Sequence, residues 1–175
     1  MRRLIVTAAV AALAVAFVVV PTGAEGAKSS KYLWATINIC DTLKHPNDMG
    51  VRASMPGDGT HKRMYMRFRA QFYNATKKRY ENVQGSGLSG WIYAGSARYT
   101  FRQAGFTFSF DRPAPGAEFK LRGVVSFEWR KKQRTRSGKR RWVVVRKATR
   151  VTKGGRAGVR GADPPGFSSG VCQIR

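Results

Sequence analysis

The stretch EFKLRGVVSFEWR, residues 118–130, decides the fold of this chain. Its apolar residues recur at every second position from Phe119 to Trp129, and charged or polar residues lie between most of them. This period of two is typical of a β-strand with one face in a core and the other in water. Val124 breaks the alternation, and Gly123 beside it marks a bulge or a close backbone contact.

The same alternation is clearest in KRMYMRFRAQFY, residues 62–73. One parity is apolar and consists of Met64, Met66, Phe68, Ala70 and Phe72. A helix would instead repeat its apolar residues every three or four positions. The polar run 74–78 predicts a hairpin turn, and the return strand is expected to begin at 80–83.

Shorter runs of the same kind predict further strands at 31–40, 91–93, 97–102, 106–110, 141–152 and 170–174. Residues 141–152 are apolar on both parities, which indicates a central strand or one covered at its tip. Residues 41–60 are rich in Pro and Gly, so we expect mostly loop there, with at most a short edge strand at 51–55. Residues 103–105 are expected to be a turn and 154–170 a loop.

About eight short strands with turn signals between them, and no convincing helix after the first residues, predict an all-β fold. An antiparallel β-sandwich or a barrel fits this pattern. A disulfide that joins the two ends of the domain favours the sandwich.

Residues 1–26 have the layout of a secretory signal peptide, with a helical apolar segment. The basic start Met1-Arg2-Arg3 precedes an apolar run at 4–20, and small residues lead up to cleavage after Gly26. Cleavage after Ala24 is an alternative, and so is an uncleaved membrane anchor, because the apolar run is just long enough to span a bilayer. The expected mature chain, residues 27–175, is one β-sandwich domain.

Cys40 and Cys172 are the only cysteines of the sequence. An even number of cysteines in an exported protein predicts a disulfide, here between the first strand and the last. The alternative is two free thiols or a catalytic cysteine, which would need a histidine partner.

Charge is the most unusual property of the composition. The chain carries 33 Lys and Arg against 9 Asp and Glu, a formal net charge of +24. Such a charge attracts polyanions, most strongly at low salt, although it also serves simply to keep a secreted protein soluble. The charge is densest in RKKQRTRSGKRR, residues 130–141, a predicted hairpin tip. The candidate polyanion-binding residues are Arg130, Lys131, Lys132, Arg134, Arg136, Lys139, Arg140 and Arg141.

Trp129 and Trp142 flank this hairpin, one on each arm. They could stack on bases or sugars, as aromatic residues of single-strand binders do, or simply cap the core.

A second candidate site lies in the expected loop 41–61, where Asp41, His45, Asp48, Asp58 and His61 gather. Two imidazoles and a carboxylate can bind a divalent metal, but acidic residues in turns commonly bond the backbone instead. The sequence has no GxSxG motif and no carboxylate pair at a spacing that suggests hydrolysis. We therefore predict no catalytic residue, no metal ligand and no cofactor.

Four stretches resemble uncharacterised secreted actinobacterial proteins that have an immunoglobulin-like or fibronectin-like sandwich. They are LWATINICD at 33–41, GVRASMPG at 50–57, FKLRGVVSFEWR at 119–130 and GADPPGFSSGVC at 161–172. The resemblance covers most of the mature chain and implies an immunoglobulin-like strand arrangement. It implies no activity, and the two cysteines near the termini depart from the usual pair on the middle strands.

The sequence thus predicts a secreted, non-enzymatic protein that contacts anionic polymers of the cell envelope through the hairpin 130–141. The alternatives are a structural or protein-interaction module whose charge is incidental, and an extracellular nucleic-acid-binding protein. No small-molecule substrate is indicated.

Overall fold

The computed structural model describes residues 31–175, and the predicted signal peptide at 1–26 lies outside them. The described residues form nine β-strands and one short 3₁₀ turn, without an α-helix. All pairings between these strands are antiparallel. The prediction of an all-β antiparallel sandwich is therefore confirmed, with nine strands where about eight were expected.

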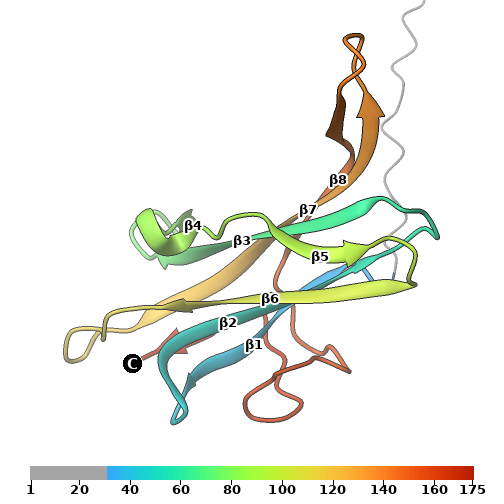
Figure 1. Cartoon of the computed structure of the whole chain (residues 1–175). Coiled ribbons are helices and arrows are strands. Elements are labelled where there is room, and N and C mark those ends of the chain that lie inside the picture. Colours follow the sequence, from blue (N-terminus) through green and yellow to red (C-terminus); the bar gives the residue numbers. More distant parts are fainter. Residues whose placement is uncertain (1–30) are drawn as a thin grey trace, which may run out of the picture.

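The strands make two sheets that pack face to face (Figure 1). The three-stranded sheet has the order β1 (Trp34–Thr42), β2 (His45–Pro56), β6 (Phe101–Ser109). The six-stranded sheet has the order β4 (Arg79–Asn82), β3 (Arg63–Asn74), β7 (Phe119–Arg134), β8 (Arg140–Val151). In addition, β5 (Ile92–Ser96) pairs with β3, and β9 (Cys172–Ile174) pairs with β7.

β7 lies in the middle of the six-stranded sheet and supplies much of the core. Leu121, Val125, Phe127 and Trp129 are at most 1% exposed, which confirms the face predicted from the alternation. Facing them from β2 are Met49, Val51, Ala53 and Met55, all equally buried. Burial of each large apolar side chain contributes roughly 1.5 to 3 kcal/mol, so this layer of side chains holds the two sheets together.

Two specific contacts join β7 to the opposite sheet. The indole Nε1 of Trp129 donates a hydrogen bond to the carbonyl oxygen of Pro56, at 3.0 Å. A Cβ atom at Gly123 would lie 2.8 Å from a methyl carbon of Val51 and 2.9 Å from that of Thr152. Of the two alternatives predicted for Gly123, the structure shows the close contact, because the register with β3 is regular there.

The prediction of a loop at 41–60 is wrong over most of its length. β2 occupies His45–Pro56 and is the central strand of its sheet. Its prolines stand at the two ends of the strand, where a missing N–H is tolerated. Gly50 allows a close approach, since a Cβ there would lie 2.9 Å from the Cβ of Ile39. Tertiary packing thus turns a segment rich in Pro and Gly into a buried strand.

The turn predicted at 103–105 is also absent. β6 runs without interruption through these residues, which pair with Arg52, Ala53 and Ser54 of β2. The strand expected at 97–102 is wrong over most of its length, because residues 97–100 form the turn before β6, and only 101–102 belong to the same strand as 106–109. The small residues Ala104 and Gly105 fit against β2 rather than reversing the chain.

β8 is an edge strand, not the central strand that its apolar residues suggested. Val144, Val145 and Val151 are exposed. The segment 154–170 is loop, as predicted, and it covers the free edge of β1. The amide of Ile37 donates to the carbonyl of Ser169 at 2.8 Å, and the amide of Ser169 donates back to Ile37 at 3.0 Å.

Cys40 of β1 and Cys172 of β9 form the predicted disulfide, with their Cα atoms 5.4 Å apart. The bond joins the three-stranded sheet to the six-stranded sheet across a sequence separation of 132 residues. Such a bond fits an extracellular protein. Within residues 31–175, no helix has the length and apolar character needed to cross a membrane.

Candidate polyanion-binding arm

The eight candidate residues lie on a projecting hairpin, which we call the basic arm (residues 130–141). β3 pairs with β7 only as far as Arg130, opposite Arg63. Beyond this point β7 pairs with β8 alone, so the arm is a two-stranded ribbon. A register shift between Trp129 and Arg130 lies at its base. Such an irregularity bends and twists a strand, and the ribbon rises away from both sheets in Figure 1.

The tip of the arm is a short turn held by backbone hydrogen bonds. The amide of Thr135 donates to the carbonyl of Lys139 at 2.8 Å, and the amide of Gly138 donates to the carbonyl of Thr135 at 3.0 Å. Gly138 has a φ of 76°, a conformation that glycine adopts without steric cost. The Ser-Gly pair in the middle of the basic run thus defines the point at which the chain reverses.

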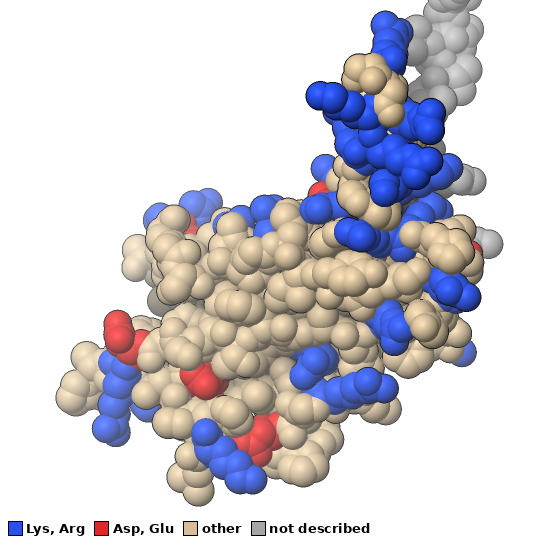
Figure 2. Space-filling model, viewed as in Figure 1, with Lys and Arg blue, Asp and Glu red and all other residues tan. Residues whose placement is uncertain are grey.

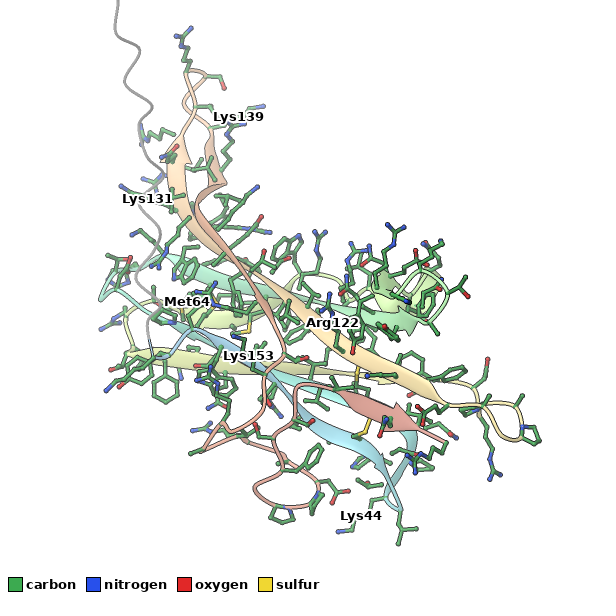
Figure 3. All side chains as sticks on the ribbon, turned by 180° about the vertical axis from the view of Figure 1, so that it is seen from behind. Lys44, Met64, Arg122, Lys131, Lys139 and Lys153 are labelled. Carbon is green, nitrogen blue, oxygen red and sulfur yellow. A yellow bond between two sulfur atoms is a disulfide. The ribbon has the colours of Figure 1, made fainter. Side chains whose placement is uncertain are left out.

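Seven of the eight candidate residues are exposed and form no ion pair with any residue in the described range 31–175. They are Lys131, Lys132, Arg134, Arg136, Lys139, Arg140 and Arg141. Figure 2 shows Lys and Arg side chains covering the arm, and in Figure 3 they extend from Lys131 near its base to Lys139 near its tip.

The eighth residue, Arg130, is set apart from the others. Its Nη2 atom lies 2.7 Å from Oε2 of Glu128, and the side chain is only 22% exposed. Its charge is therefore already balanced at the base of the arm, and we remove Arg130 from the group of free cations.

Like charges face each other across the ribbon. Arg134 and Arg140 are directly opposite in the register, and Arg141 is opposite the uncharged Gln133. Directly opposed like charges destabilise a pair of strands. An anion placed between the two arginines would remove this repulsion and release counterions.

The two tryptophans beside the arm have different environments, and the proposed stacking pair is not formed. Trp129 is 1% exposed and belongs to the core, so it is inaccessible to a base or sugar. Trp142 is half-buried, and the guanidinium carbon of Arg63 lies 4.3 Å from its ring centroid. Trp129 cannot stack on a ligand because its side chain points from β7 toward the opposite sheet, where it is buried.

A ladder of arginines and aromatic rings on the outer face of the six-stranded sheet was missed by the sequence reasoning. We call it the arginine–aromatic face, and it consists of Arg63, Tyr65, Arg67, Trp91, Tyr93, Arg130 and Trp142. Each arginine lies over at least one ring, at 4.2 to 5.6 Å from guanidinium carbon to ring centroid. The available signal was the outward parity of 62–73, which consists of arginine and tyrosine except for Gln71.

The acidic and histidine residues of 41–61 do not come together. His45 and Asp48 lie at the start of β2, with Nδ1 and Oδ2 3.7 Å apart. Asp58 and His61 follow the other end of that strand, which contains 12 residues. Because an extended strand of this length covers roughly 36 Å, the two histidines cannot share one metal ion. Among residues 31–175, no group of three His, Cys, Asp or Glu side chains could hold a metal.

The fold and the arm together define an all-β sandwich with a protruding basic hairpin. Comparison with protein families finds no family model that matches the chain. Comparison with curated proteins finds no significant match.

Proposed function

We propose that this is a secreted, non-enzymatic protein that binds anionic polymers of the cell envelope through the basic arm. The observation that carries the proposal is the set of seven exposed cations with no acidic partner in the described part of the chain. A two-stranded ribbon presents them on both faces and away from the sheets, where a long polymer can reach them without steric hindrance.

Two features support an extracellular location. The disulfide between Cys40 and Cys172 is a bond that persists in oxidising compartments. The sequence of residues 1–26 has the charge and apolar pattern of a signal peptide.

The strand order supports an immunoglobulin-like sandwich. In an immunoglobulin domain the first, second, fourth and fifth strands form one sheet, and the third, sixth and seventh form the other. If β5 is set aside as a short addition to β3, the orders β1-β2-β6 and β3-β7-β8 follow this scheme, and β4 departs from it because it pairs with β3. The disulfide lies elsewhere, between β1 and β9.

The test compares the parent with a variant in which Arg134, Arg136, Arg140 and Arg141 are changed to Ser. Binding to a polyglycerol-phosphate polymer of the teichoic acid type is measured at several salt concentrations. Each phosphate contact contributes roughly 0.7 to 0.9 to the slope of log K against log salt. We expect the variant to bind far more weakly and its slope to fall by about 3.

A matched control removes the same amount of charge elsewhere. Lys44, Arg98, Arg112 and Lys153 are exposed and form no ion pair within the described residues. Lys44 lies at the opposite end of the molecule from the arm (Figure 3). Changing these four residues to Ser should leave most of the affinity for the polymer and most of the slope of log K against log salt.

Equal losses in the two variants would show that net charge, and not the arm, attracts the polymer. Absence of binding by the parent at low salt would favour a structural or protein-interaction module. Tighter binding to single-stranded DNA than to polyglycerol phosphate of the same charge would favour an extracellular nucleic-acid-binding protein.

A further inference from the structure

The arginine–aromatic face begins where the basic arm ends. Lys132 of the arm pairs with Trp142 in the β7–β8 register. Arg63 lies over the Trp142 ring at 4.3 Å and over the Tyr93 ring at 5.6 Å. The contacts therefore lead without a break from the arm onto the outer face of the six-stranded sheet.

The face continues toward the middle of the sheet through Trp91. The guanidinium carbon of Arg130 lies 5.1 Å from the Trp91 ring and 4.2 Å from the Tyr65 ring. Arg67 lies over Trp91 at 4.7 Å. Tyr65 and Tyr93, opposite each other in the β3–β5 register, have ring centroids 5.4 Å apart. The rings thus keep the guanidinium groups close to the outer face of the sheet.

Two of these arginines have unused donors. Within residues 31–175, Arg63 and Arg67 form no ion pair, and their guanidinium groups donate no hydrogen bond to a protein atom. The carboxylate of Glu128, on the same face, is engaged by Arg130 at 2.7 Å and approached by Lys147 at 4.0 Å. A guanidinium stacked on a ring keeps its N–H groups around the rim of its plane, and these donate well to phosphate oxygens.

The junction between the arm and the face is hollow. A cavity of about 480 Å³ is bounded by Thr60, His61, Lys62, Lys131, Lys132 and Trp142. It has no acidic residue in its lining, so a chain of negative charges can pass from the arm across Trp142 to Arg63. The Lys62 ammonium itself is paired with Asp58.

We propose that Arg63 and Arg67 bind phosphate groups of the same polymer that the arm binds, so that the binding track continues along the sheet. This inference rests on the proposed function of the arm. The partner is a phosphodiester polymer recognised through its backbone. The recognition does not use stacking on bases or sugars, because arginine side chains already lie over the rings of the face.

The test changes Arg63 and Arg67 to Gln and measures affinity for short and long polyglycerol-phosphate chains. The short chain is chosen to cover the arm only. The parent should bind the long chain more tightly than the short one, and the Arg63→Gln, Arg67→Gln variant should lose most of this gain, about tenfold or more. Its affinity for the short chain should stay within about twofold of the parent.

The matched control changes Arg98 and Arg112 to Gln, which removes the same charge from exposed positions outside the face. A second variant, Arg63→Lys with Arg67→Lys, keeps the charge but removes the flat guanidinium donors. We expect the control to bind both chains as the parent does. The lysine variant should restore less than half of the long-chain advantage in affinity that the glutamine variant loses. A melting temperature is measured for each variant to separate weaker folding from weaker binding.

The outcomes separate this inference from the proposed function. If the parent does not bind polyglycerol phosphate, the proposed function of the arm is wrong, and this inference is wrong as well. If the arm variant loses binding but the glutamine variant still binds the long chain as much more tightly as the parent does, the proposed function of the arm is supported and this inference is overturned.

The source and chemistry of the polymer are tested in parallel. Single-stranded DNA with the same number of phosphates distinguishes a nucleic-acid source from a cell-wall source, and a similar tenfold loss there would support recognition of the phosphodiester itself. If the glutamine variant loses as much of its long-chain affinity for poly-glutamate as for polyglycerol phosphate, the preference for phosphate is overturned.

Discussion

Gly123 is a residue whose missing side chain matters. Its Cα approaches β2 so closely that an added methyl group would meet Val51 at 2.8 Å and Thr152 at 2.9 Å. Its amide N–H donates a hydrogen bond to Oγ1 of Thr152 at 3.1 Å. Both neighbours are buried, so neither can move aside freely.

We expect Gly123→Ala to destabilise the fold by about 1 to 3 kcal/mol, because overpacking forces side chains or backbone to shift. Urea unfolding, followed by tryptophan fluorescence, measures this change. The control is Gly90→Ala, since Gly90 is exposed and a Cβ there would meet nothing within 4 Å. That control should change stability by less than about 0.5 kcal/mol, and equal effects of the two substitutions would contradict the contact.

At the scale of an element, the β3–β4 hairpin depends on one carboxylate. Glu81 accepts hydrogen bonds from the ammonium of Lys77 at 2.9 Å and the amide nitrogen of Asn74 at 3.0 Å, and also from Arg79. The Lys77 ammonium, followed by the Asn74 amide and the Arg79 guanidinium, lowers the pKa of Glu81 from 4.5 to about 2. The charged form is therefore the one that the folded hairpin favours.

The sign of the pH dependence follows from this lowered pKa. Stabilisation by Glu81 is complete above about pH 4.5, the ordinary value, and is lost as the pH falls toward 2. We expect Glu81→Gln to unfold at lower urea concentration than the parent at pH 7, and the difference to disappear near pH 2. A difference that is the same at both pH values would contradict the role of the charge.

At the scale of the whole molecule, the disulfide closes nearly the entire domain. Cys40 and Cys172 are 132 residues apart and lie in different sheets. We expect the double substitution Cys40→Ser, Cys172→Ser to lower the free energy of unfolding by about 2 to 5 kcal/mol, mainly because the unfolded chain gains freedom. Urea unfolding of the two proteins, compared by midpoint and slope, measures the loss.

Reductant provides the control for this prediction. It should destabilise the parent by a similar amount and leave the serine variant unchanged. If the parent is insensitive to a reductant that is shown to open its disulfide, then the bond does not stabilise the fold and the prediction is wrong.

The strands β3 and β7 could be predicted because one parity of each is almost purely apolar. That alternation is local, so it is visible without neighbours. Most of β2, beyond the short edge strand allowed for at 51–55, was missed because Pro46, Gly50 and Pro56 carry the local signals of a loop. Their positions in the strand become acceptable only when β1 and β6 lie on either side. The edge position of β8 is likewise decided by pairing, not by its own residues.

The cations of the arm could be predicted, because residues 130–141 are dense in charge and surround a Ser-Gly turn. The sequence could not show that seven of these cations have no acidic partner in the described residues. Nor could it show that the eighth, Arg130, pairs with Glu128. The arginine–aromatic face combines residues from β3, β5, β7 and β8, which are far apart in the chain. No local pattern brings Trp91 next to both Arg67 and Arg130.

The sequence by itself determined the all-β class, the inward face of β7, the disulfide partners and the basic hairpin. These follow from short-range alternation, from having just two cysteines and from charge density. The tertiary structure alone decided which strands are neighbours, that Trp129 is buried, and that stacked arginines extend from the base of the arm. The physical reason is that strand pairing and packing between sheets join residues distant in the chain, where local preference carries no information.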